Sequence, residues 1–355
     1  LKLVSVRNHK EKEFDFSPGV TAIWGENGSG KTAVLEAINT LSFGKSFKTH
    51  RQRELINTEK KELFIWGEFF SNGQEDQVAA RVSEISGQVI KLNGKNIYSR
   101  KELLGRNVVV VLSPEEQDIT KGPPAERRSF FDKVFSVVSP EYLQTLQNYS
   151  RTLKQRNAAL LQLRDNIITE ENLETWAKPL SLSGSKLWQL RGRFMADFCA
   201  LLVSVVQQYD SEIKMEILYS APVQDEEQYQ KKLVKKIRQD ISRGRTGYGP
   251  HRDDVVLNWS GRNIKSFGSQ GEHKLCLIFL KLVELFFIKE KTGISPTLLL
   301  DDLFAKLDLE RSKNIVHLLQ ELESSSGEPV QTIVTTTDLL NVEHSGLMST
   351  SPDHC

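Results

Sequence analysis

The chain has 355 residues, of which 39% are hydrophobic and 26% charged, with 11 prolines and 3 cysteines. These proportions exclude a disordered chain, a collagen-like fibre and a small disulfide scaffold, and the length allows about two domains. Lys and Arg number 47 against 46 for Asp and Glu, a formal net charge of +1. Any nucleic-acid surface must therefore be a local patch and not a property of the whole chain.

Neither export nor membrane insertion is expected. The three cysteines have no metal-ligand spacing, which favours a reducing compartment, and the first residues lack the apolar core of a signal peptide. The most apolar stretch, residues 275–288, is interrupted by Lys281 and Glu284 at the spacing of one helix face. It is predicted as an amphipathic helix and not as a membrane span.

Strands joined by short turns are predicted over the first hundred or so residues. One early helix interrupts them, with a buried stripe formed by Val34, Leu35, Ile38 and Leu41. Asn93-Gly94 separates two short strand-like runs, and both residues tolerate positive φ, so a hairpin is expected there. The continuously apolar run at residues 108–112 is typical of a strand covered on both faces.

The character changes to helix between about residues 125 and 240, as the apolar spacing of three and four indicates. One stripe consists of Leu143, Leu146, Tyr149 and Leu153, and a second of Leu187, Leu190, Phe194, Phe198, Leu201 and Val205. We expect the two stripes to form the core of an antiparallel arm or small bundle. Strands return afterwards, with a second hairpin at Ser260-Gly261 and buried strands at residues 298–300 and 332–334.

A phosphate-binding loop is predicted directly after the strand at residues 20–24. It reads Gly25-Glu26-Asn27-Gly28-Ser29-Gly30-Lys31-Thr32 and opens the early helix. Glycines let backbone N–H groups wrap phosphates without a Cβ clash, and the helix N-terminus adds partial positive charge. We expect Lys31 to reach the β- and γ-phosphates of ATP and the Thr32 hydroxyl to bind Mg²⁺.

A phosphate loop also needs a carboxylate at the end of a neighbouring strand to hold the metal. Asp301 and Asp302 end the apolar run at residues 297–300. Asp301 is the predicted Mg²⁺ ligand, directly or through water, and Asp302 the group that orients the attacking water. Two aspartates could instead simply cap the following helix.

The segment Ser269-Gln270-Gly271-Glu272 precedes the apolar helix, about thirty residues before the acidic strand. A Ser-rich signature stands in this place in ABC ATPases. Ser269 and the adjacent amides could bind the γ-phosphate held by a second copy of the chain. Taken alone, the segment could be a plain helix N-cap. In ABC ATPases a loop that crosses the dimer interface follows the acidic strand, and residues 305–308 stand at that place.

These motifs predict an α/β fold, an ABC-class P-loop ATPase head with mixed β-sheets and a helical insertion. The predicted ATPase lobe comprises residues 1–112, with the P-loop, and residues 245–355, with the signature and the acidic strand. Residues 113–244 are predicted to form a second, helical lobe with a short antiparallel arm.

The sequence resembles the RecF family of recombination and repair ATPases, which is related to Rad50 and SMC heads. The resemblance covers nearly the whole chain. It rests on Arg7-Asn8, the P-loop, Gly44-Lys45-Ser46-Phe47-Lys48, the run at residues 149–157, Ser269-Gln270-Gly271-Glu272 and Leu300-Asp301-Asp302-Leu303. The most discriminating run is Gly249-Pro250-His251-Arg252-Asp253-Asp254, which transporters and SMC heads do not carry.

The resemblance implies a cytoplasmic, nucleoid-associated protein that uses ATP and Mg²⁺ and forms a homodimer with ATP. It also implies sequence-independent binding to duplex DNA at gaps or junctions, loading of recombinase with RecO and RecR, and slow ATP hydrolysis. Two roles stay open. Thr337 or Asp338 could replace the usual γ-phosphate-sensing His, and Gln117, Ser113 or Glu115 could face the metal.

Two clusters of basic residues are candidates for DNA binding through phosphates. The first consists of Lys45, Lys48, Arg51 and Arg53, and the second of Lys231, Lys232, Lys235, Lys236, Arg238, Arg243 and Arg245. Either could instead be a solvated surface. Alternative functions are an ABC transporter subunit, which predicts a Ser-Gly-Gly-Gln signature, and an ABC-headed nuclease, which needs a further acidic domain.

Overall fold

The computed structural model describes residues 1–71, 73–165, 167, 169, 173, 175–219, 222, 225–302, 309–326 and 330–347. Residue contacts divide the chain into two compact units. Unit 1 comprises Leu1–Gln117, Val205–Glu212 and Leu277–Cys355, and unit 2 comprises Asp118–Ser204 and Ile213–Cys276. The division into lobes at 112/113 and 244/245 stays a prediction. Residues 305–308, proposed above as an interface loop, lie outside the described residues.

The first sheet of unit 1 is antiparallel throughout, with strand order β2-β1-β4-β5-β6-β7. Its strands are β1 (Lys2–Val6), β2 (His9–Glu13), β4 (Glu62–Ser71), β5 (Gln74–Ser83), β6 (Gly87–Leu92) and β7 (Lys95–Ile97). The predicted hairpin at Asn93-Gly94 is confirmed. The two residues have φ of 50° and 79°, as a two-residue turn with two positive φ angles requires.

The second sheet of unit 1 is parallel, with order β3-β13-β12-β8. Its strands are β3 (Val20–Trp24), β8 (Val109–Leu112), β12 (Thr297–Asp301) and β13 (Thr332–Thr336). The three runs predicted as buried strands are confirmed, since β8 and β13 are buried throughout and β12 is buried after Thr297. Parallel strands bring their carboxyl ends to one edge, where ligands bind in open α/β sheets.

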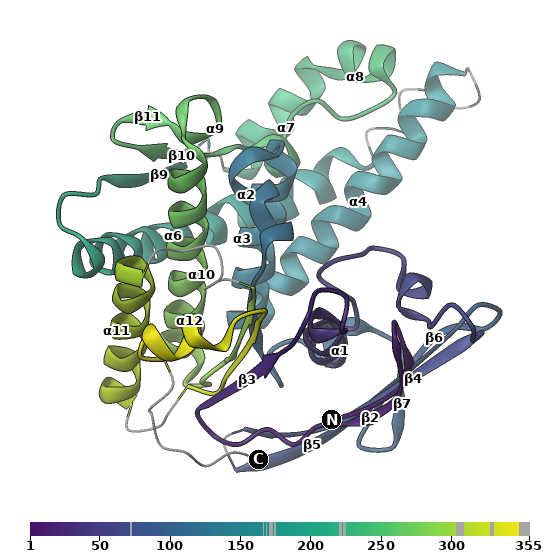
Figure 1. Ribbon diagram of the computed structural model, residues 1–355. Helices are drawn as coiled ribbons and strands as arrows, with labels where there is room; N and C mark the ends of the chain where they lie inside the picture. The colour runs from purple at the N-terminus through teal and green to yellow at the C-terminus, as the bar shows by residue number, and fades with distance from the viewer. Residues whose placement is uncertain are drawn as a thin grey trace. The chain divides into compact units, whose positions relative to one another are not determined.

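Helix α1 (Lys31–Phe43) contacts strands of both sheets of unit 1 (Figure 1). Its predicted stripe is confirmed, because Val34, Leu35, Ile38 and Leu41 are all buried. Gly67 in β4 permits the close approach, since a Cβ there would lie 2.8 Å from Leu41 Cδ1. Burial on two sides fixes the direction of α1, and with it the position of the P-loop at its N-terminus.

Unit 2 contains most of the helices together with a small antiparallel sheet of order β11-β10-β9. Its elements are α2 (Asp118–Lys121), α3 (Pro124–Val138), α4 (Pro140–Arg164), β9 (Met215–Tyr219), α7 (Glu226–Lys235), α8 (Ile237–Arg243), β10 (Val255–Trp259), β11 (Arg262–Asn263) and α9 (Ile264–Phe267). The Ser260-Gly261 hairpin joins β10 and β11 as predicted, with φ of 49° and 75°. Strand β9 falls in the region predicted as helical, because its partner β10 is distant in sequence.

The remaining elements include two long helices that have residues in both units, α6 (Ala177–Tyr209) and α10 (Gln270–Thr292). Unit 1 also has α11 (Leu309–Ser326) and α12 (Leu339–His344). Short 3-10 turns are η1 (Gln52–Leu55), η2 (Arg100–Glu102), η3 (Pro114–Gln117) and η4 (Pro250–Arg252).

The two predicted helix stripes have different outcomes. The α6 stripe is confirmed, since Leu187, Leu190, Phe194, Phe198 and Val205 are buried and Leu201 is half-buried. The α4 stripe is displaced. Leu143, Leu146 and Leu153 are only half-buried, whereas Tyr142, Tyr149, Arg156 and Leu160 are buried. The displacement arises because the core face of α4 carries polar groups with buried partners, which a hydropathy pattern does not register.

Helix α10 corrects the prediction of an amphipathic helix at residues 275–288. Lys281 is 1% exposed and Glu284 is 0% exposed, so neither lies on a solvated face. Lys281 Nζ lies 2.6 Å from Glu284 Oε2 and 3.0 Å from Glu116 Oε1. Burial disfavours the ammonium charge, but the two carboxylates raise the pKa of Lys281 above its usual value. Residues 275–288 are buried except for the half-buried Phe286, and Lys281 forms an ion cluster with two carboxylates.

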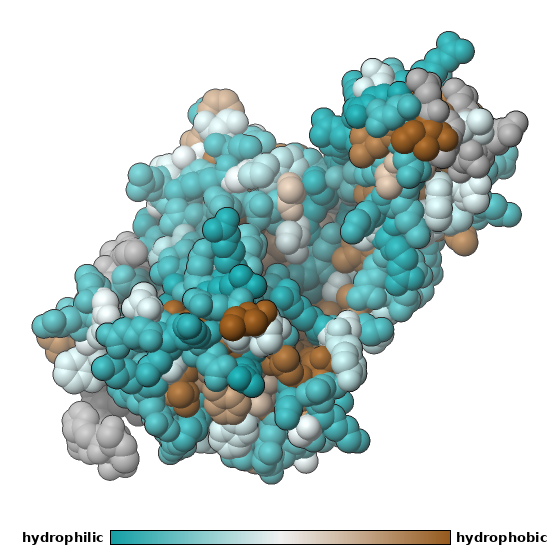
Figure 2. Space-filling model, turned by 90° about the vertical axis from the view of Figure 1, so that its right-hand side faces the viewer, coloured by the Kyte–Doolittle hydropathy of each residue, from teal (hydrophilic) through white to brown (hydrophobic). Residues whose placement is uncertain are grey.

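Within the described parts of the chain, no helix is long and apolar enough to cross a membrane. Figure 2 shows a face that is largely hydrophilic, with separate hydrophobic patches. Such scattered patches are ordinary on a protein surface.

Candidate nucleotide site

The P-loop connects β3 to α1 through glycines in conformations that other residues rarely adopt. Gly25, Gly28 and Gly30 have φ of 153°, 83° and 98°. Gly30 is the N-cap of α1, and no side chain caps the helix there. The first N–H groups of α1 therefore face the loop without a side-chain acceptor, which is the arrangement that binds phosphate at helix N-termini.

Lys31 folds back over the loop. Its Nζ donates hydrogen bonds to the carbonyl oxygens of Gly25 at 2.7 Å and Glu26 at 2.9 Å. Phosphate oxygens are stronger acceptors for an ammonium group than these carbonyls, so bound phosphate would replace the carbonyls as partners of Lys31. The side chain predicted to reach the β- and γ-phosphates is thus held at the mouth of the loop.

Thr32 and Asp301 are 269 residues apart in sequence but are joined by a hydrogen bond. The Thr32 hydroxyl donates to Asp301 Oδ1 at 2.9 Å, and the Thr335 hydroxyl donates to the same oxygen at 2.7 Å. Burial raises the pKa of the Asp301 carboxyl, although these two hydrogen bonds oppose the shift. A buried carboxylate beside a hydroxyl is a donor set that suits Mg²⁺, which takes few protein ligands and completes its shell with water and phosphate.

Asp302, the predicted water-orienting residue, follows directly with φ of 51°. Its backbone N–H donates to the Thr335 carbonyl at 3.1 Å, so β13 holds the turn. A left-handed conformation costs a residue other than glycine about 1–2 kcal/mol, and aspartate tolerates it better than most. Two successive residues at the end of β12 thereby direct their side chains differently, Asp301 toward Thr32 and Asp302 onto the cavity lining.

Lys48 and Glu115 lie beside this centre and were not predicted as a pair. Lys48 Nζ lies 3.1 Å from Glu115 Oε1, and the Ser113 hydroxyl donates to Glu115 Oε2 at 2.5 Å. Burial raises the pKa of Glu115, but these two donors outweigh burial and lower it overall. The charges of Glu115 and Lys48 both act on Asp301. Lys48 therefore lies on the side of Asp301, the predicted Mg²⁺ ligand, although the sequence grouped it with candidate DNA-binding residues.

The β1–β2 turn supports the P-loop from the other side. Asn8 Nδ2 donates to the Gly28 carbonyl at 2.8 Å, and His9 Nε2 lies 3.1 Å from the Gly30 carbonyl. Arg7 forms two hydrogen bonds with Glu36 of α1, at 3.0 and 3.1 Å. Glu36 is 2% exposed and also accepts from Ser46. Only the pair Arg7-Asn8, noted above for its resemblance to a family motif, pointed to this support.

Several of these groups line an open cavity of about 750 Å³ in unit 1. Its lining includes Asn8, Gly28, Gly30, Lys31, Thr32, Lys48, Asp301, Asp302, Thr335 and Thr337. Residues from the carboxyl ends of β3, β12 and β13 therefore meet in one cavity with a P-loop. This is the arrangement of an ATP-binding site in a P-loop protein.

Comparison with known proteins agrees with this geometry. A family model described as the RecF/RecN/SMC N terminal domain matches residues 1–348. The DNA replication and repair protein RecF of Alkaliphilus oremlandii is 33% identical over 347 residues, covering 95% of this chain and 92% of that protein. The RecF of Exiguobacterium sp. is 34% identical over 365 residues, covering 100% and 96%. The chain belongs to the RecF family.

Solved structures give the same result. The recombination mediator protein RecF with ATP, in the RecFOR pathway, matches with a TM-score of 0.86 at 30% identity, over 95% of this chain and 91% of that chain. An Smc head bound to the C-winged helix domain of ScpA matches with a TM-score of 0.55 at 19% identity, over 97% and 90%, which shows the shared fold alone. The predicted fold class, an ABC-class ATPase head, is confirmed.

The signature segment of this RecF-family chain forms a capping box. The Ser269 backbone N–H donates to Glu272 Oε2 at 2.7 Å, and the Glu272 N–H donates to Ser269 Oγ at 3.3 Å. The plain N-cap alternative thus describes the isolated chain. It does not block the predicted role, because Ser269 Oγ acts as an acceptor here and its own O–H is still able to donate. Roles for Ser269, Gln270, Gly271 and Glu272 at a partner's nucleotide stay predictions.

The DNA-binding role of the first basic cluster also stays a prediction. Arg51 is an exposed residue, 4.0 Å from Glu54. In the second cluster, Lys231 pairs with Glu227, and Lys232 and Lys236 lie over the ring of Tyr248. These positions are compatible with a solvated surface and with phosphate contact.

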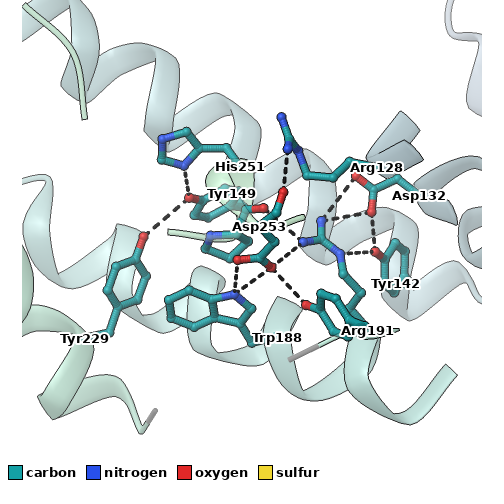
Figure 3. A network of polar contacts seen from close by, with 11 residues as sticks. Arg128, Asp132, Tyr142, Tyr149, Trp188, Arg191, Tyr229, His251 and Asp253 are labelled. Carbon is teal, nitrogen blue, oxygen red and sulfur yellow. Dashed lines mark hydrogen bonds and ion pairs between the residues drawn. The ribbon is translucent and has the colours of Figure 1, made fainter. Parts of the chain in front are cut away.

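The run that most resembles RecF, residues 249–254, lies in a buried polar network of unit 2 (Figure 3). Asp253 accepts hydrogen bonds from Trp188, Arg191 and Tyr219, each at 2.9 Å. Arg191 also donates to the Pro250 carbonyl at 3.0 Å and to Asp132 at 2.9 Å.

The other residues of the run also have buried partners. Arg127 binds both oxygens of Asp254, and His251 Nδ1 lies 2.6 Å from Tyr149 Oη. A Cβ at Gly249 would overlap the hydroxyls of Tyr149 and Tyr229, so only glycine fits there. The run therefore links β10 to α3, α4 and α6, and its contacts are structural.

Proposed function

We propose that this chain is an ATP-dependent DNA-binding protein of recombinational repair, in which ATP joins two copies into a clamp on DNA near single-strand gaps. The observation that carries the proposal is the Thr32–Asp301 hydrogen bond beside Lys31 in the P-loop cavity. It joins a phosphate-binding loop to a metal-binding carboxylate, which an ATP hydrolase needs and a simple turn does not.

In this proposal the backbone N–H groups of residues 25–32 and the Lys31 ammonium bind the phosphates. Thr32 and Asp301 hold Mg²⁺, which when bound supplies Lewis-acid stabilisation of the phosphate charge. Asp302 orients the attacking water. We expect weak ATP hydrolysis, since the Asp302 side chain is shorter than the glutamate of faster relatives. We also expect DNA to stimulate this hydrolysis.

The cavity lining supports a choice for one open role, and the electrostatics of Asp301 support a choice for the other. Thr337 lines the cavity, while Asp338 Oδ1 accepts a hydrogen bond from the Leu340 N–H at the start of α12. We therefore assign the γ-phosphate contact to Thr337. Glu115 acts electrostatically on Asp301, so we assign the metal-facing role after β8 to Glu115 and not to Gln117.

The clamp itself requires a second copy of the chain. ATP on each P-loop would be covered by the partner's signature segment around Ser269, which gives two composite sites related by two-fold symmetry. Hydrolysis would remove the shared γ-phosphate and release the two heads. By family membership we further propose sequence-independent binding of duplex DNA, cooperation with RecR and RecO in loading recombinase, and a cytoplasmic location.

An ABC transporter subunit is the alternative, and the available observations do not favour it. Its Ser-Gly-Gly-Gln signature is replaced by Ser269-Gln270-Gly271-Glu272. The curated relatives described above are DNA replication and repair proteins.

The proposal is tested by DNA binding with ATP, ADP and no nucleotide, for the wild type, Lys31→Ala and Ser269→Arg. We expect ATP to raise the affinity of the wild type at least tenfold, about 1.4 kcal/mol. Lys31→Ala should lose this gain through weak ATP binding. Ser269→Arg should keep ATP binding but lose the gain. DNA affinity that ignores nucleotide and both substitutions would refute the clamp.

A further inference from the structure

A groove in unit 2 lies outside the nucleotide site and has a volume of about 460 Å³. One side is a face of α3, with Ala125, Arg128, Ser129, Asp132, Lys133 and Ser136. The other side is a face of α4, with Leu146, Tyr149, Ser150 and Leu153, and Leu187, Arg191 and His251 complete the lining. From Ala125 to Ser136 the groove extends along about 16 Å of helix at 1.5 Å per residue.

The floor of the groove is held together by buried hydrogen bonds and ion pairs. Arg191 is 2% exposed and binds Asp132 and Asp253, and Tyr142 donates to Asp132 (Figure 3). Although burial disfavours its charge, Asp132 raises the pKa of Arg191 above its usual range. The polar groups of the floor thus already have protein partners and do not need a ligand.

The α3 side has polar groups whose capacity is not used. Ser136 is 7% exposed, and its hydroxyl has no hydrogen-bond partner within the described structure. Native proteins rarely leave a buried hydroxyl unpaired. Arg128 donates to the Asp253 carbonyl, and burial together with the charge of Arg191 lowers its pKa. The charges of Asp132, Asp253 and Asp254 offset this only in part, so an anion beside Arg128 would further stabilise its positive charge.

The α4 side is apolar and only partly covered. Leu146 and Leu153 of α4 are half-buried and line the groove together with the buried Leu187 of α6, so leucine side chains lie opposite the polar side. This face was predicted as core from its periodicity, and no element of the described structure covers it completely. A ligand with both apolar and anionic groups matches the two sides.

DNA does not match this chemistry well. Its phosphates bind exposed cations and gain nothing from a leucine-lined wall. A free phosphate would use the cationic side alone. An extended peptide rises about 3.3 Å per residue, so about five residues span 16 Å and alternate side chains can address the two sides.

We propose that the α3–α4 groove is a docking site for an acidic and apolar peptide segment of a partner protein, with carboxylates on the Arg128 side and leucine-like side chains against Leu146 and Leu153. The groove lies in unit 2 and is separate from the nucleotide cavity of unit 1. Binding is therefore expected without nucleotide, and it is tested independently of the proposed function.

The test uses a fluorescein-labelled pentapeptide, Leu-Glu-Leu-Glu-Leu, blocked at both ends, and its counterpart with Lys in place of Glu. We expect saturable binding of the acidic peptide and at least tenfold weaker binding of the basic one. Arg128→Gln and Leu153→Asn should each weaken binding at least fivefold. Lys154→Gln removes the same charge from an exposed α4 residue outside the groove, and it should change binding less than twofold.

Methyl NMR of the wild type makes the result independent of variant stability. The acidic peptide should shift the methyl signals of Leu146, Leu153 and Leu187 and few others. Equal binding of both peptides, equal effects of Arg128→Gln and Lys154→Gln, or shifts confined to other leucines would overturn the proposal. Displacement of the peptide by a 20-base-pair duplex at equal charge concentration would make the groove a DNA surface and overturn it as well. Displacement by millimolar inorganic phosphate would assign it to a free anion instead.

Discussion

Lys48 illustrates how one residue changes its assignment once its neighbours are known. In the sequence it stands among Lys45, Arg51 and Arg53, and a basic run suggests contact with DNA. In the structure its ammonium lies 3.1 Å from Glu115 and acts on Asp301. Its charge therefore neutralises the carboxylates that we assign to the metal.

This position predicts a nucleotide effect for Lys48 that its neighbour lacks. Lys48→Met should raise the Kd for ATP in the presence of Mg²⁺ about fivefold or more, or roughly 1 kcal/mol, because a cation is lost from the phosphate cavity. Arg51→Met removes an 85% exposed cation and should change that Kd less than twofold. Titration with a fluorescent ATP analogue measures both. Equal effects of the two substitutions would contradict this assignment.

His251 gives the molecule a specific dependence on pH. Burial lowers the pKa of His251 to about 4, and the charges of Arg252 and Arg128 add to the shift. Its Nε2 lies 3.0 Å from the Thr246 carbonyl, which can only accept, so Nε2 carries the proton and Nδ1 accepts from Tyr149. The neutral ring is thus the form that the native structure binds.

The sign of the effect follows from linkage. A depressed native pKa stabilises the protein above the unfolded pKa of about 6.5, and this stability is lost as pH falls toward 4. Protonation of His251 should lower the free energy of unfolding by about 2 kcal/mol between pH 7.5 and pH 5. Urea unfolding at both pH values should show that loss in the wild type. In His251→Gln the loss should be smaller by about 2 kcal/mol. Identical losses in the wild type and the variant would show that His251 does not titrate.

At the scale of the element, α10 shows why a long apolar helix can carry charged residues. Lys281 lies between Glu284, one helix turn away, and Glu116 from η3. The helical spacing of three and four residues predicts that Lys281 and Glu284 lie on a solvated face. Their burial depends instead on a carboxylate 165 residues away, which local periodicity does not contain.

Lys281→Met is expected to lower the free energy of unfolding by about 3–5 kcal/mol, because two carboxylates lose a buried cation. Adding Glu284→Gln should recover part of this loss, since one of the two negative charges is then removed. Lys265→Met, at an exposed position of α9, serves as the control and should change stability by less than about 0.5 kcal/mol. Chemical denaturation followed by tryptophan fluorescence measures all three. A double variant less stable than Lys281→Met would contradict the ion-cluster explanation.

At the scale of the whole molecule, the proposed clamp depends on two copies of the chain. With ATP, Asp302→Asn should accumulate as a dimer in sedimentation velocity, because nucleotide binding is retained while hydrolysis is slowed. With ADP it should sediment as a monomer. Ser269→Arg should stay monomeric with ATP, since its side chain would block the partner's γ-phosphate. A monomer of Asp302→Asn at saturating ATP would rule out the clamp.

The sequence by itself determined the elements that depend on neighbours in the chain. The P-loop, the helix that follows it, both glycine hairpins and the buried parallel strands all follow from local spacing and turn chemistry. The order of the motifs also determined the ABC class and the resemblance to RecF, which the family match confirms.

Tertiary structure alone decided which distant groups meet. Thr32 bonds to Asp301, Lys48 pairs with Glu115, and the polar face of α4 became the core face because its partners lie far along the chain. The physical reason is that burying a charged residue is costly unless a partner of opposite charge or hydrogen bonds compensate it, and packing supplies that partner. Hydropathy therefore predicted where strands and helices lie, while the site and its charge balance required the folded chain.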